Sequence, residues 1–194
     1  MVLKPDREGL TRAAQLLRSG GVIAFPTDTV YGLGADASDE VAQKRIFAIK
    51  GRPVGMPLIL MAAAESQLEG WVHMDTRAEE IIRRWWPGPL TVILHAPGGR
   101  TLGVRIPKHE VALELLRASG PLMTTSANLH GKEPAMSPEE AGELPGLAAV
   151  LDGGRASGGT PSTVLDLTGP EPHILREGAI PGADLLGPPP PKAG

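Results

Sequence analysis

Apolar residues recur at helical spacing in several stretches of the chain. Leu10, Ala13 and Leu17 share one face of a predicted helix, and the Gly20-Gly21 pair after it supplies a left-handed stop. Other stretches of this kind begin at capping residues such as Asp39. The pattern predicts helices at residues 6–19, 39–49, 76–85, 109–118 and 137–142.

Short apolar runs rich in β-branched residues lie between these helices. They predict strands at residues 22–25, 58–61, 90–94, 102–106, 122–124, 150–151 and 162–167. Two of these strands follow each other directly across residues 97–99, so a strict alternation of strand and helix fails there. We therefore predict an α/β fold with a twisted mixed β-sheet and flanking helices rather than a doubly wound parallel sheet.

Composition limits the size and surroundings of this fold. The 194 residues, of which 41% are hydrophobic, suffice for one well-buried core. We predict a single domain over residues 1–186 and an extended proline-rich tail at 187–194. The absence of cysteine, of a signal-peptide pattern and of any run long enough to span a membrane favours the cytoplasm.

The net charge of −3 argues against a protein whose main role is to neutralise a long phosphate backbone, although a local basic face could still contact RNA. Two polar clusters nevertheless suggest two halves of one anion-binding site. Lys50 and Arg52, just after a predicted helix, offer an ammonium and a planar guanidinium to phosphate oxygens. Ser126 and Asn128 follow a predicted strand. A solvated cation pair and a simple turn are the structural alternatives.

Arg105 stands in an apolar strand, where its charge requires a partner. It could pair with a structural carboxylate or hold the carboxylate of a ligand, and the sequence leaves both possibilities open. Ser126 lacks the Gly-x-Ser-x-Gly elbow of serine hydrolases, the chain has no glycine-rich phosphate-binding motif, and the five histidines are scattered. We therefore predict neither a catalytic nucleophile nor a metal site built from protein ligands.

Six motifs in one order carry a resemblance to a known family. They are FPTDTVYGL at 25–33, KGRP at 50–53, WPGPLT at 86–91, VRIP at 104–107, TSAN at 125–128 and PSTVLD at 161–166. Over about residues 9–180 the chain resembles the YrdC-like L-threonylcarbamoyladenylate synthases, in their short, single-domain form. The resemblance implies a concave, positively lined cavity that binds ATP, L-threonine and bicarbonate and yields threonylcarbamoyl-AMP and pyrophosphate.

The resemblance also implies roles for particular residues. The ATP contacts would be Lys50, Arg52, Thr101, Ser126, Asn128 and Arg176, with Mg²⁺ on the triphosphate. The L-threonine contacts would be Thr29, Tyr31, Arg105, Thr124 and Ser162. Lys50 and Arg52 would position the substrates, which themselves supply nucleophile and electrophile.

Two departures from the family pattern leave part of the cavity wall open to question. Met56 and Met61 stand where many relatives carry asparagine and histidine. The implied partners are tRNA-modification enzymes that receive the product, together with weak binding of tRNA or other RNA. The alternative hypothesis is a divergent or RNA-binding paralogue without the synthase activity.

Overall fold

The computed structural model describes residues 1–51, 53 and 55–186. Ten strands form one sheet over these residues, in the order β1-β8-β2-β3-β7-β4-β6-β5-β9-β10. The strands are β1 (Val2–Leu3), β2 (Ile23–Phe25), β3 (Gly32–Asp36), β4 (Ile59–Met61), β5 (Leu90–Ala96), β6 (Arg100–Arg105), β7 (Leu122–Ser126), β8 (Ala149–Leu151), β9 (Thr163–Asp166) and β10 (His173–Arg176). The α-helices are α1 (Arg7–Arg18), α2 (Glu40–Lys50), α3 (Thr76–Trp85), α4 (Glu110–Ser119), α5 (Pro138–Gly142) and α6 (Gly182–Leu186), and short 3₁₀ turns span Glu65–Leu68 and Pro97–Gly99.

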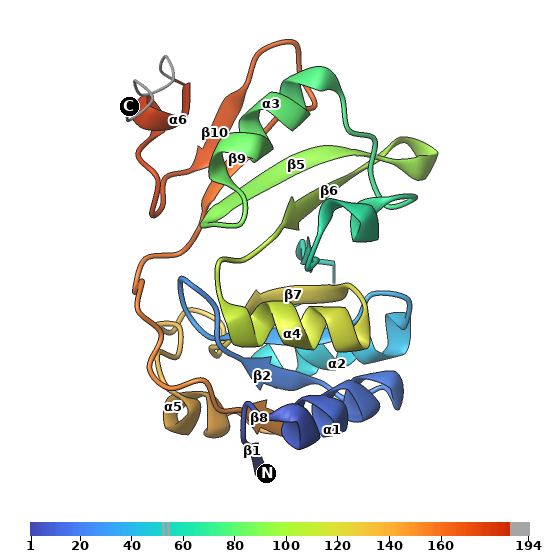
Figure 1. The fold of residues 1–194 in the computed structure, drawn as a ribbon, viewed down its shortest axis with the longest axis vertical. Helices are drawn as coiled ribbons and strands as arrows, with labels where there is room; N and C mark the ends of the chain where they lie inside the picture. Colours follow the sequence, from blue (N-terminus) through green and yellow to red (C-terminus); the bar gives the residue numbers. More distant parts are fainter. Residues whose placement is uncertain (52, 54, 187–194) are drawn as a thin grey trace.

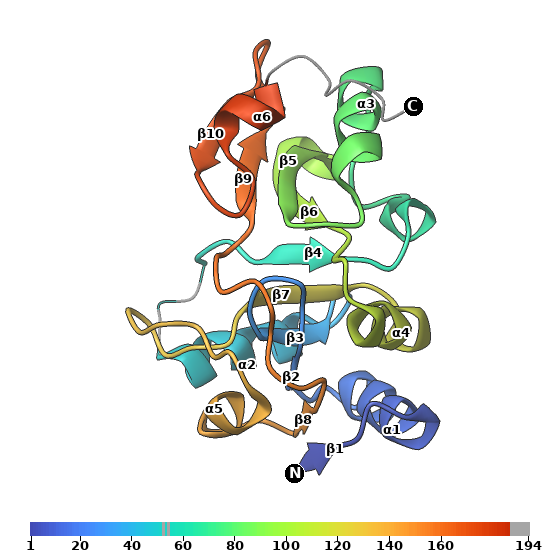
Figure 2. The same ribbon diagram turned by 60° about the vertical axis from the view of Figure 1, so that its left-hand side comes forward.

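The sheet is mixed and strongly twisted (Figure 1). β5 pairs with β6 in antiparallel register, whereas β4 pairs with β6 and β5 pairs with β9 in parallel register. β1 and β8 lie at one end of the molecule, β9 and β10 lie at the other, and β4 crosses between the two halves (Figure 2). The predicted fold class is confirmed, including the direct succession of two strands between residues 90 and 106.

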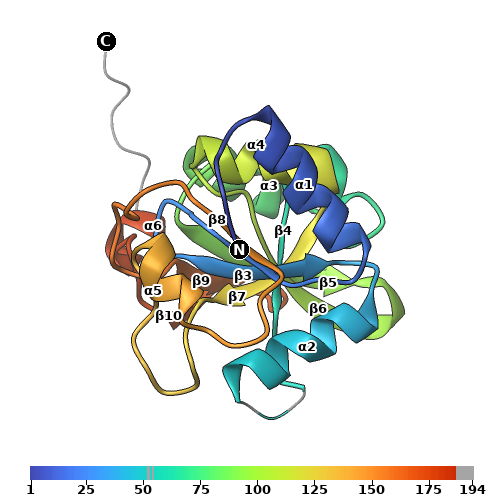
Figure 3. The ribbon, with the colours of Figure 1, turned by 90° about the horizontal axis from the view of Figure 1, so that it is seen from below.

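Helices cover both faces of the half that contains β2, β3, β7 and β8. α1 and α4 lie together on one side of it, and α2 lies on the other (Figure 3). The buried side chains of Leu17, Phe25 and Leu116 belong to the first of these layers, and those of Leu33 and Ile46 belong to the second. This half is therefore closed on both faces by apolar packing.

The half that contains β4, β6, β5 and β9 is closed on one face only. Leu60, Val104, Val92 and Leu165 point from neighbouring strands into a core that includes Ile82 of α3. Since successive side chains of a strand point to opposite faces, the residues between them face the other way. That second face lines the cavity described below.

Capping residues set the helix ends close to their predicted positions. Asp39 accepts from the backbone N–H groups of Val41 and Ala42 at the start of α2, and Gly51 ends it with a left-handed φ of 61°. Lys50 is therefore the last residue of α2, which corrects the prediction that it lies just past the helix. The last turn of α2 therefore holds the backbone of Lys50.

Some elements were not predicted. The segment of β3 has the composition of a loop, because it contains glycines, which are rare in strands. It forms a strand because it pairs with β2 on one side and with β7 on the other. β1 is very short, and β10 is mostly exposed, so neither has an apolar signature. The predicted tail at 187–194 lies outside the described residues, and the division into domain and tail stays a prediction.

Candidate functional site

A cavity of about 450 Å³ opens on the uncovered face of the sheet. Gly103 is one of the residues that line it. A Cβ at this position would lie 3.1 Å from the Cγ2 of Ile59 and 3.4 Å from that of Thr91, so a larger side chain would crowd these two neighbours. The walls are mostly hydroxyl-bearing or apolar. The residues that line the cavity are Thr27, Thr29, Val30, Tyr31, Gly32, Met56, Pro57, Leu58, Ile59, Met61, Thr91, Ile93, Gly103, Arg105, Thr124, Thr125, Ser126, Pro161, Ser162, Val164, Leu175 and Arg176.

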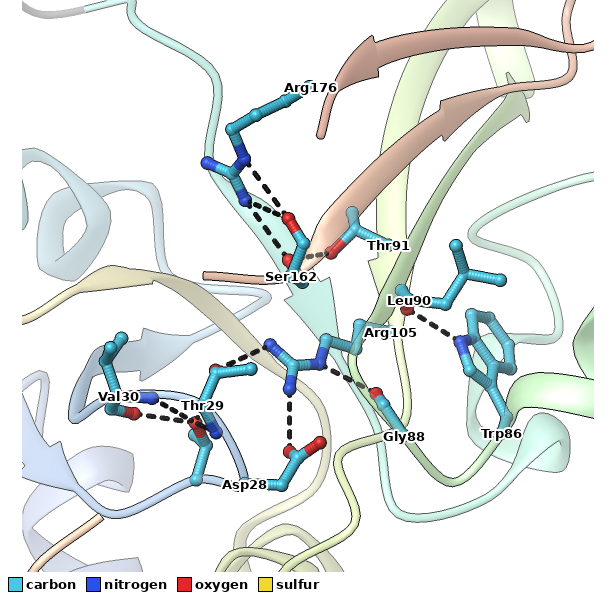
Figure 4. Close-up of polar contacts among 11 residues, drawn as sticks. Asp28, Thr29, Val30, Trp86, Gly88, Leu90, Thr91, Arg105, Ser162 and Arg176 are labelled. Carbon is cyan, nitrogen blue, oxygen red and sulfur yellow. Dashed lines mark hydrogen bonds and ion pairs between the residues drawn. The ribbon is translucent and has the colours of Figure 1, made fainter. Parts of the chain in front are cut away.

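Arg105 is the most constrained charge in this wall. Its side chain is only 2% exposed, and its Nη2 donates to Asp28 Oδ1 at 2.6 Å. Nη1 donates to Thr29 Oγ1 at 3.1 Å and Nε to the Gly88 carbonyl at 3.0 Å (Figure 4). Arg105 thus pairs with a structural carboxylate, one of the two possibilities that the sequence left open, and that carboxylate is Asp28. These bonds do not use the whole donor set of the guanidinium, so a ligand carboxylate can still bind.

Arg176 borders the same cavity from β10. Its Nε and Nη2 donate to the Ser162 carbonyl at 3.1 and 2.8 Å, and Nη2 also reaches Ser162 Oγ at 3.2 Å. Ser162 Oγ in turn lies 2.8 Å from Thr91 Oγ1 (Figure 4). All of these partners are neutral.

Two guanidinium groups, those of Arg105 and Arg176, line the cavity. Burial lowers the pKa of Arg105, the carboxylate of Asp28 opposes that effect, and the charge of Arg176 lowers the same pKa further. Burial alone lowers the pKa of Arg176. No described residue that lines the cavity is acidic. Asp28 offsets the charge of Arg105, whereas the partners of Arg176 are neutral, so an anionic ligand would be attracted chiefly by Arg176.

Lys50 lies at the edge of this region, where α2 and β7 both end. Its buried Nζ donates to the carbonyls of Ser126 at 2.6 Å and Asn128 at 2.8 Å, and to Asn128 Oδ1 at 2.7 Å. Ser126 Oγ donates to the same Oδ1 at 2.6 Å. The structure thus brings together Lys50, Ser126 and Asn128 from distant parts of the chain. Arg52, the fourth predicted member, lies outside the described residues.

The predicted threonine contacts gather around Arg105. Thr29 bonds to it directly, whereas the hydroxyl of Thr124, also in the wall, donates to the Ile59 carbonyl at 3.1 Å. Met61 is buried and pairs with Arg105 across β4 and β6, whereas Met56 is 39% exposed. The two methionines therefore make that part of the wall apolar.

Of two further predicted contacts, Tyr31 lines the cavity and Thr101 does not. Tyr31 is fully buried, and its hydroxyl donates to the Gly154 carbonyl at 2.7 Å and accepts from the Gly153 N–H. Burial also raises the pKa of Tyr31. Its ring packs in the core with Leu33, and the residue also forms part of the cavity wall. Thr101 is exposed and borders a separate hollow, not the main cavity.

Asp28 and Thr91 hold positions at the site that no local sequence pattern indicates. In the sequence, no second acid accompanies Asp28 at a useful spacing. Its partner is instead an arginine 77 positions away, a pairing that no local pattern reveals. Thr91 reads as an ordinary strand residue, and only its register beside Ser162 shows its place in the wall.

The described residues contain no cluster of three or more acidic or histidine side chains that could hold a metal ion. Mg²⁺ usually binds through carboxylates together with substrate phosphates. The cavity wall offers hydroxyls and guanidinium groups instead, which fits an ion that arrives on a nucleotide better than one held by protein side chains.

Among the described residues, no helix has the length and apolar character needed to cross a membrane.

Known proteins share this arrangement of sequence and fold. A family model described as telomere recombination, that of the Sua5, YciO and YrdC proteins, matches residues 15–178. The chain belongs to this family. The resemblance inferred from the six sequence motifs is thereby confirmed.

Within the Sua5, YciO and YrdC family, two curated relatives are threonylcarbamoyl-AMP synthases. The chain is 43% identical over 182 residues to that of Pyrococcus abyssi and 42% identical over 185 residues to that of Bacillus subtilis, which covers 87% and 88% of the chain. Each match covers 54% of the relative, so the chain spans about half the length of these proteins.

The fold comparison agrees with the sequence comparison. The crystal structure of P. abyssi Sua5 complexed with L-threonine matches with a TM-score of 0.91 at 38% identity, over 96% of this chain and 61% of the other. A Sua5 protein that was crystallised with L-threonine therefore shares the fold of this chain.

Proposed function

We propose that this chain forms threonylcarbamoyl-AMP and pyrophosphate from L-threonine, bicarbonate and ATP. The observation that carries the proposal is the buried Arg105, which Asp28 and Thr29 fix at the wall of a cavity whose described lining residues include no acid. The names of the P. abyssi and B. subtilis relatives and the L-threonine complex of Sua5 support the same activity.

The amino acid would bind beside Arg105. A guanidinium already held by three protein contacts needs little further ordering to grip a substrate carboxylate. Thr124 and Ser162 lie in the same wall and offer hydroxyls to the polar groups of the substrate. Met61, next to Arg105 in the sheet, offers an apolar surface to the methyl group of threonine.

The nucleotide would bind between Arg176 and the end of β7. Arg176, Ser126 and Asn128 would hold the phosphates, with Arg52 completing the set, and the Lys50 ammonium would contribute its charge nearby. Mg²⁺ would enter as part of the ATP substrate. Because Lys50 already donates to three oxygens at the end of β7, it also holds Ser126 and Asn128 in place before the nucleotide arrives.

The chemistry needs no protein nucleophile. The threonine amine attacks bicarbonate and water is lost, which gives an N-carboxylate. An oxygen of that carboxylate then attacks the α-phosphorus of ATP, and the bond to the bridging oxygen of pyrophosphate breaks. The protein would orient the reactants and stabilise the negative charge that develops. An enzyme that transfers the threonylcarbamoyl group to tRNA would consume the product.

Pyrophosphate release from ATP tests the proposal. Purified protein should release pyrophosphate only when L-threonine and bicarbonate are both present, and alanine should replace threonine poorly. A site that hydrogen-bonds the threonine hydroxyl rejects substrates that lack it, because its buried polar groups are left unpaired. Equal release with alanine, or none at all, would refute the synthase activity. Tight, salt-sensitive tRNA binding without turnover would instead point to the paralogue hypothesis.

A further inference from the structure

Two buried polar atoms behind Arg105 lack hydrogen-bond partners within the part of the chain that the structure describes. Asp28 gives Oδ1 to Arg105, but its Oδ2 accepts no hydrogen bond. His109, at the start of α4, has a buried Nδ1 without a partner. An unsatisfied buried polar group costs free energy, and two in one region invite a common explanation.

The two groups come from separate elements that converge at one place. Asp28 lies in the loop between β2 and β3, whereas His109 precedes α4. A Cβ added to Gly153, after β8, would lie 2.4 Å from the Cγ of Pro26 and 3.4 Å from the Cε1 of His109. The imidazole thus sits next to the segment that carries Asp28. The Asp28 carboxylate also acts on it electrostatically.

His109 occupies the N-cap of α4, yet its side chain makes no capping hydrogen bond. Its imidazole is half-buried, and burial lowers its pKa, against the opposing charges of Asp28 and Glu110. The ring is therefore held neutral, a form in which one nitrogen donates and the other accepts. The positive end of the helix dipole favours the same neutral form.

We propose that His109 is a positioning residue for the amino-acid site and acts through Asp28. Its Nδ1–H donates to one water molecule, which in turn donates to Asp28 Oδ2. Asp28 is then held from both sides, by Arg105 on Oδ1 and by His109 on Oδ2. The carboxylate cannot rotate away when a substrate carboxylate competes for Arg105, so the guanidinium keeps its orientation toward the cavity.

This inference rests on the proposed threonine site and adds a second layer to it. Asp28 is absent from the cavity wall, and so is His109. Neither residue should touch substrate. Their effect should therefore appear in threonine affinity, through Arg105, and not in the affinity for the nucleotide at the other side of the cavity.

A matched pair of variants tests the role of the hydrogen bond. Asparagine and leucine have nearly the same shape, but only the asparagine amide can donate from a position close to Nδ1. His109→Leu should weaken L-threonine binding about tenfold by calorimetry, the loss expected for one hydrogen bond to a charged group. His109→Asn should stay within about threefold of wild type by the same reasoning. Both should bind a non-hydrolysable ATP analogue as wild type does.

Two further measurements separate positioning from simple packing. The ¹⁵N shifts of the His109 ring should show a neutral imidazole protonated on Nδ1. In an Asp28→Asn background, His109→Leu should change threonine affinity much less than in wild type, because the residue it acts through has lost its charge.

The inference is overturned if the ring is protonated on Nε2, if His109→Leu binds threonine as wild type does, or if the leucine and asparagine variants lose affinity equally. Thermal unfolding of each variant checks that it is folded. If wild-type protein binds no threonine, the proposed function fails, whereas the ring tautomer still reports on the link to Asp28.

Discussion

Arg105 and Arg176 border the same cavity, yet the protein holds the two guanidinium groups in different ways. Arg105 is almost fully buried and shares its charge with the Asp28 carboxylate at 2.6 Å. Arg176 is exposed, and among the described residues it donates only to the backbone and hydroxyl oxygens of Ser162. The first charge is compensated within the protein, and the second is left for a ligand.

The different partners of the two arginines indicate which substrate group each of them would bind. A buried arginine that already has a counter-ion can be oriented accurately, but it gains only part of its charge interaction from a ligand. An arginine with neutral partners is oriented less firmly and gains more from an anion. The proposed carboxylate of threonine and the proposed phosphates of ATP match this division, and substitutions at the two positions should separate it.

The largest effect is expected from Arg105→Met. The change removes the guanidinium and leaves the Asp28 carboxylate buried without its counter-ion. Breaking a buried ion pair in this way costs about 3–5 kcal/mol. The free energy of unfolding, measured by urea denaturation, should fall by that amount, and threonine binding should be lost.

The double variant Asp28→Asn, Arg105→Met serves as the control for this comparison. It removes both charges, so it should recover part of the lost stability without recovering threonine binding. Equal stability of the single and double variants would show that the ion pair is not what makes Arg105 structurally important.

Arg176→Met should give the opposite balance. The lost partners are neutral and part of the side chain is exposed to solvent, so the free energy of unfolding should fall by only about 1 kcal/mol. The affinity for ATP should fall by about tenfold to a hundredfold, because hydrogen bonds to a charged group contribute about 1.5–3 kcal/mol. Calorimetry with an ATP analogue and with threonine measures the two affinities separately.

A fall in threonine affinity as large as the fall in ATP affinity would contradict this division of labour. Arg100 is an exposed arginine at the start of β6, outside the main cavity, and offers a matched control in the same sheet. Arg100→Met should leave both affinities unchanged.

The sequence predicted the α-helices of the described residues except the short α6, most strands and the mixed sheet, because local periodicity and capping determine these features. It also suggested that Lys50 and Ser126 belong to one site, and the structure places them in contact. It could not choose between a structural and a ligand carboxylate for Arg105. That choice depends on the meeting of β6 with the loop after β2, which contacts distant in the chain determine.

The same limit explains why β3 and the second layer at His109 escaped prediction. Gly32 and Gly34 lack the side chains that mark a strand, and β3 is defined by its pairing with β2 and β7. His109 reads as the polar residue that begins a helix. Its burial follows from the approach of Gly153 after β8, more than forty positions away.

The smallest expected effect is the change of the free energy of unfolding with pH, which tests whether a neutral His109 stabilises Asp28 beside Arg105. Burial lowers the pKa of His109 below its ordinary value of 6.5, while the charges of Asp28 and Glu110 act in the opposite direction. The unfolded chain therefore binds a proton more readily than the folded protein does. The free energy of unfolding should fall as the pH is lowered through 6.5, and the contribution should be fully present above that pH.

Urea denaturation of wild type and His109→Asn at a series of pH values between about 5 and 8 measures this contribution, over the range in which histidine titrates. The asparagine variant keeps the donor to Asp28 but cannot titrate, so the difference in unfolding free energy between the two proteins should change with pH in the stated direction. Arg105 stays charged throughout this range, so its ion pair with Asp28 contributes equally at each pH. A difference that does not vary with pH would mean that the imidazole is as easily protonated in the folded protein as in the unfolded chain, and its neutral form could not be what holds Asp28 toward Arg105.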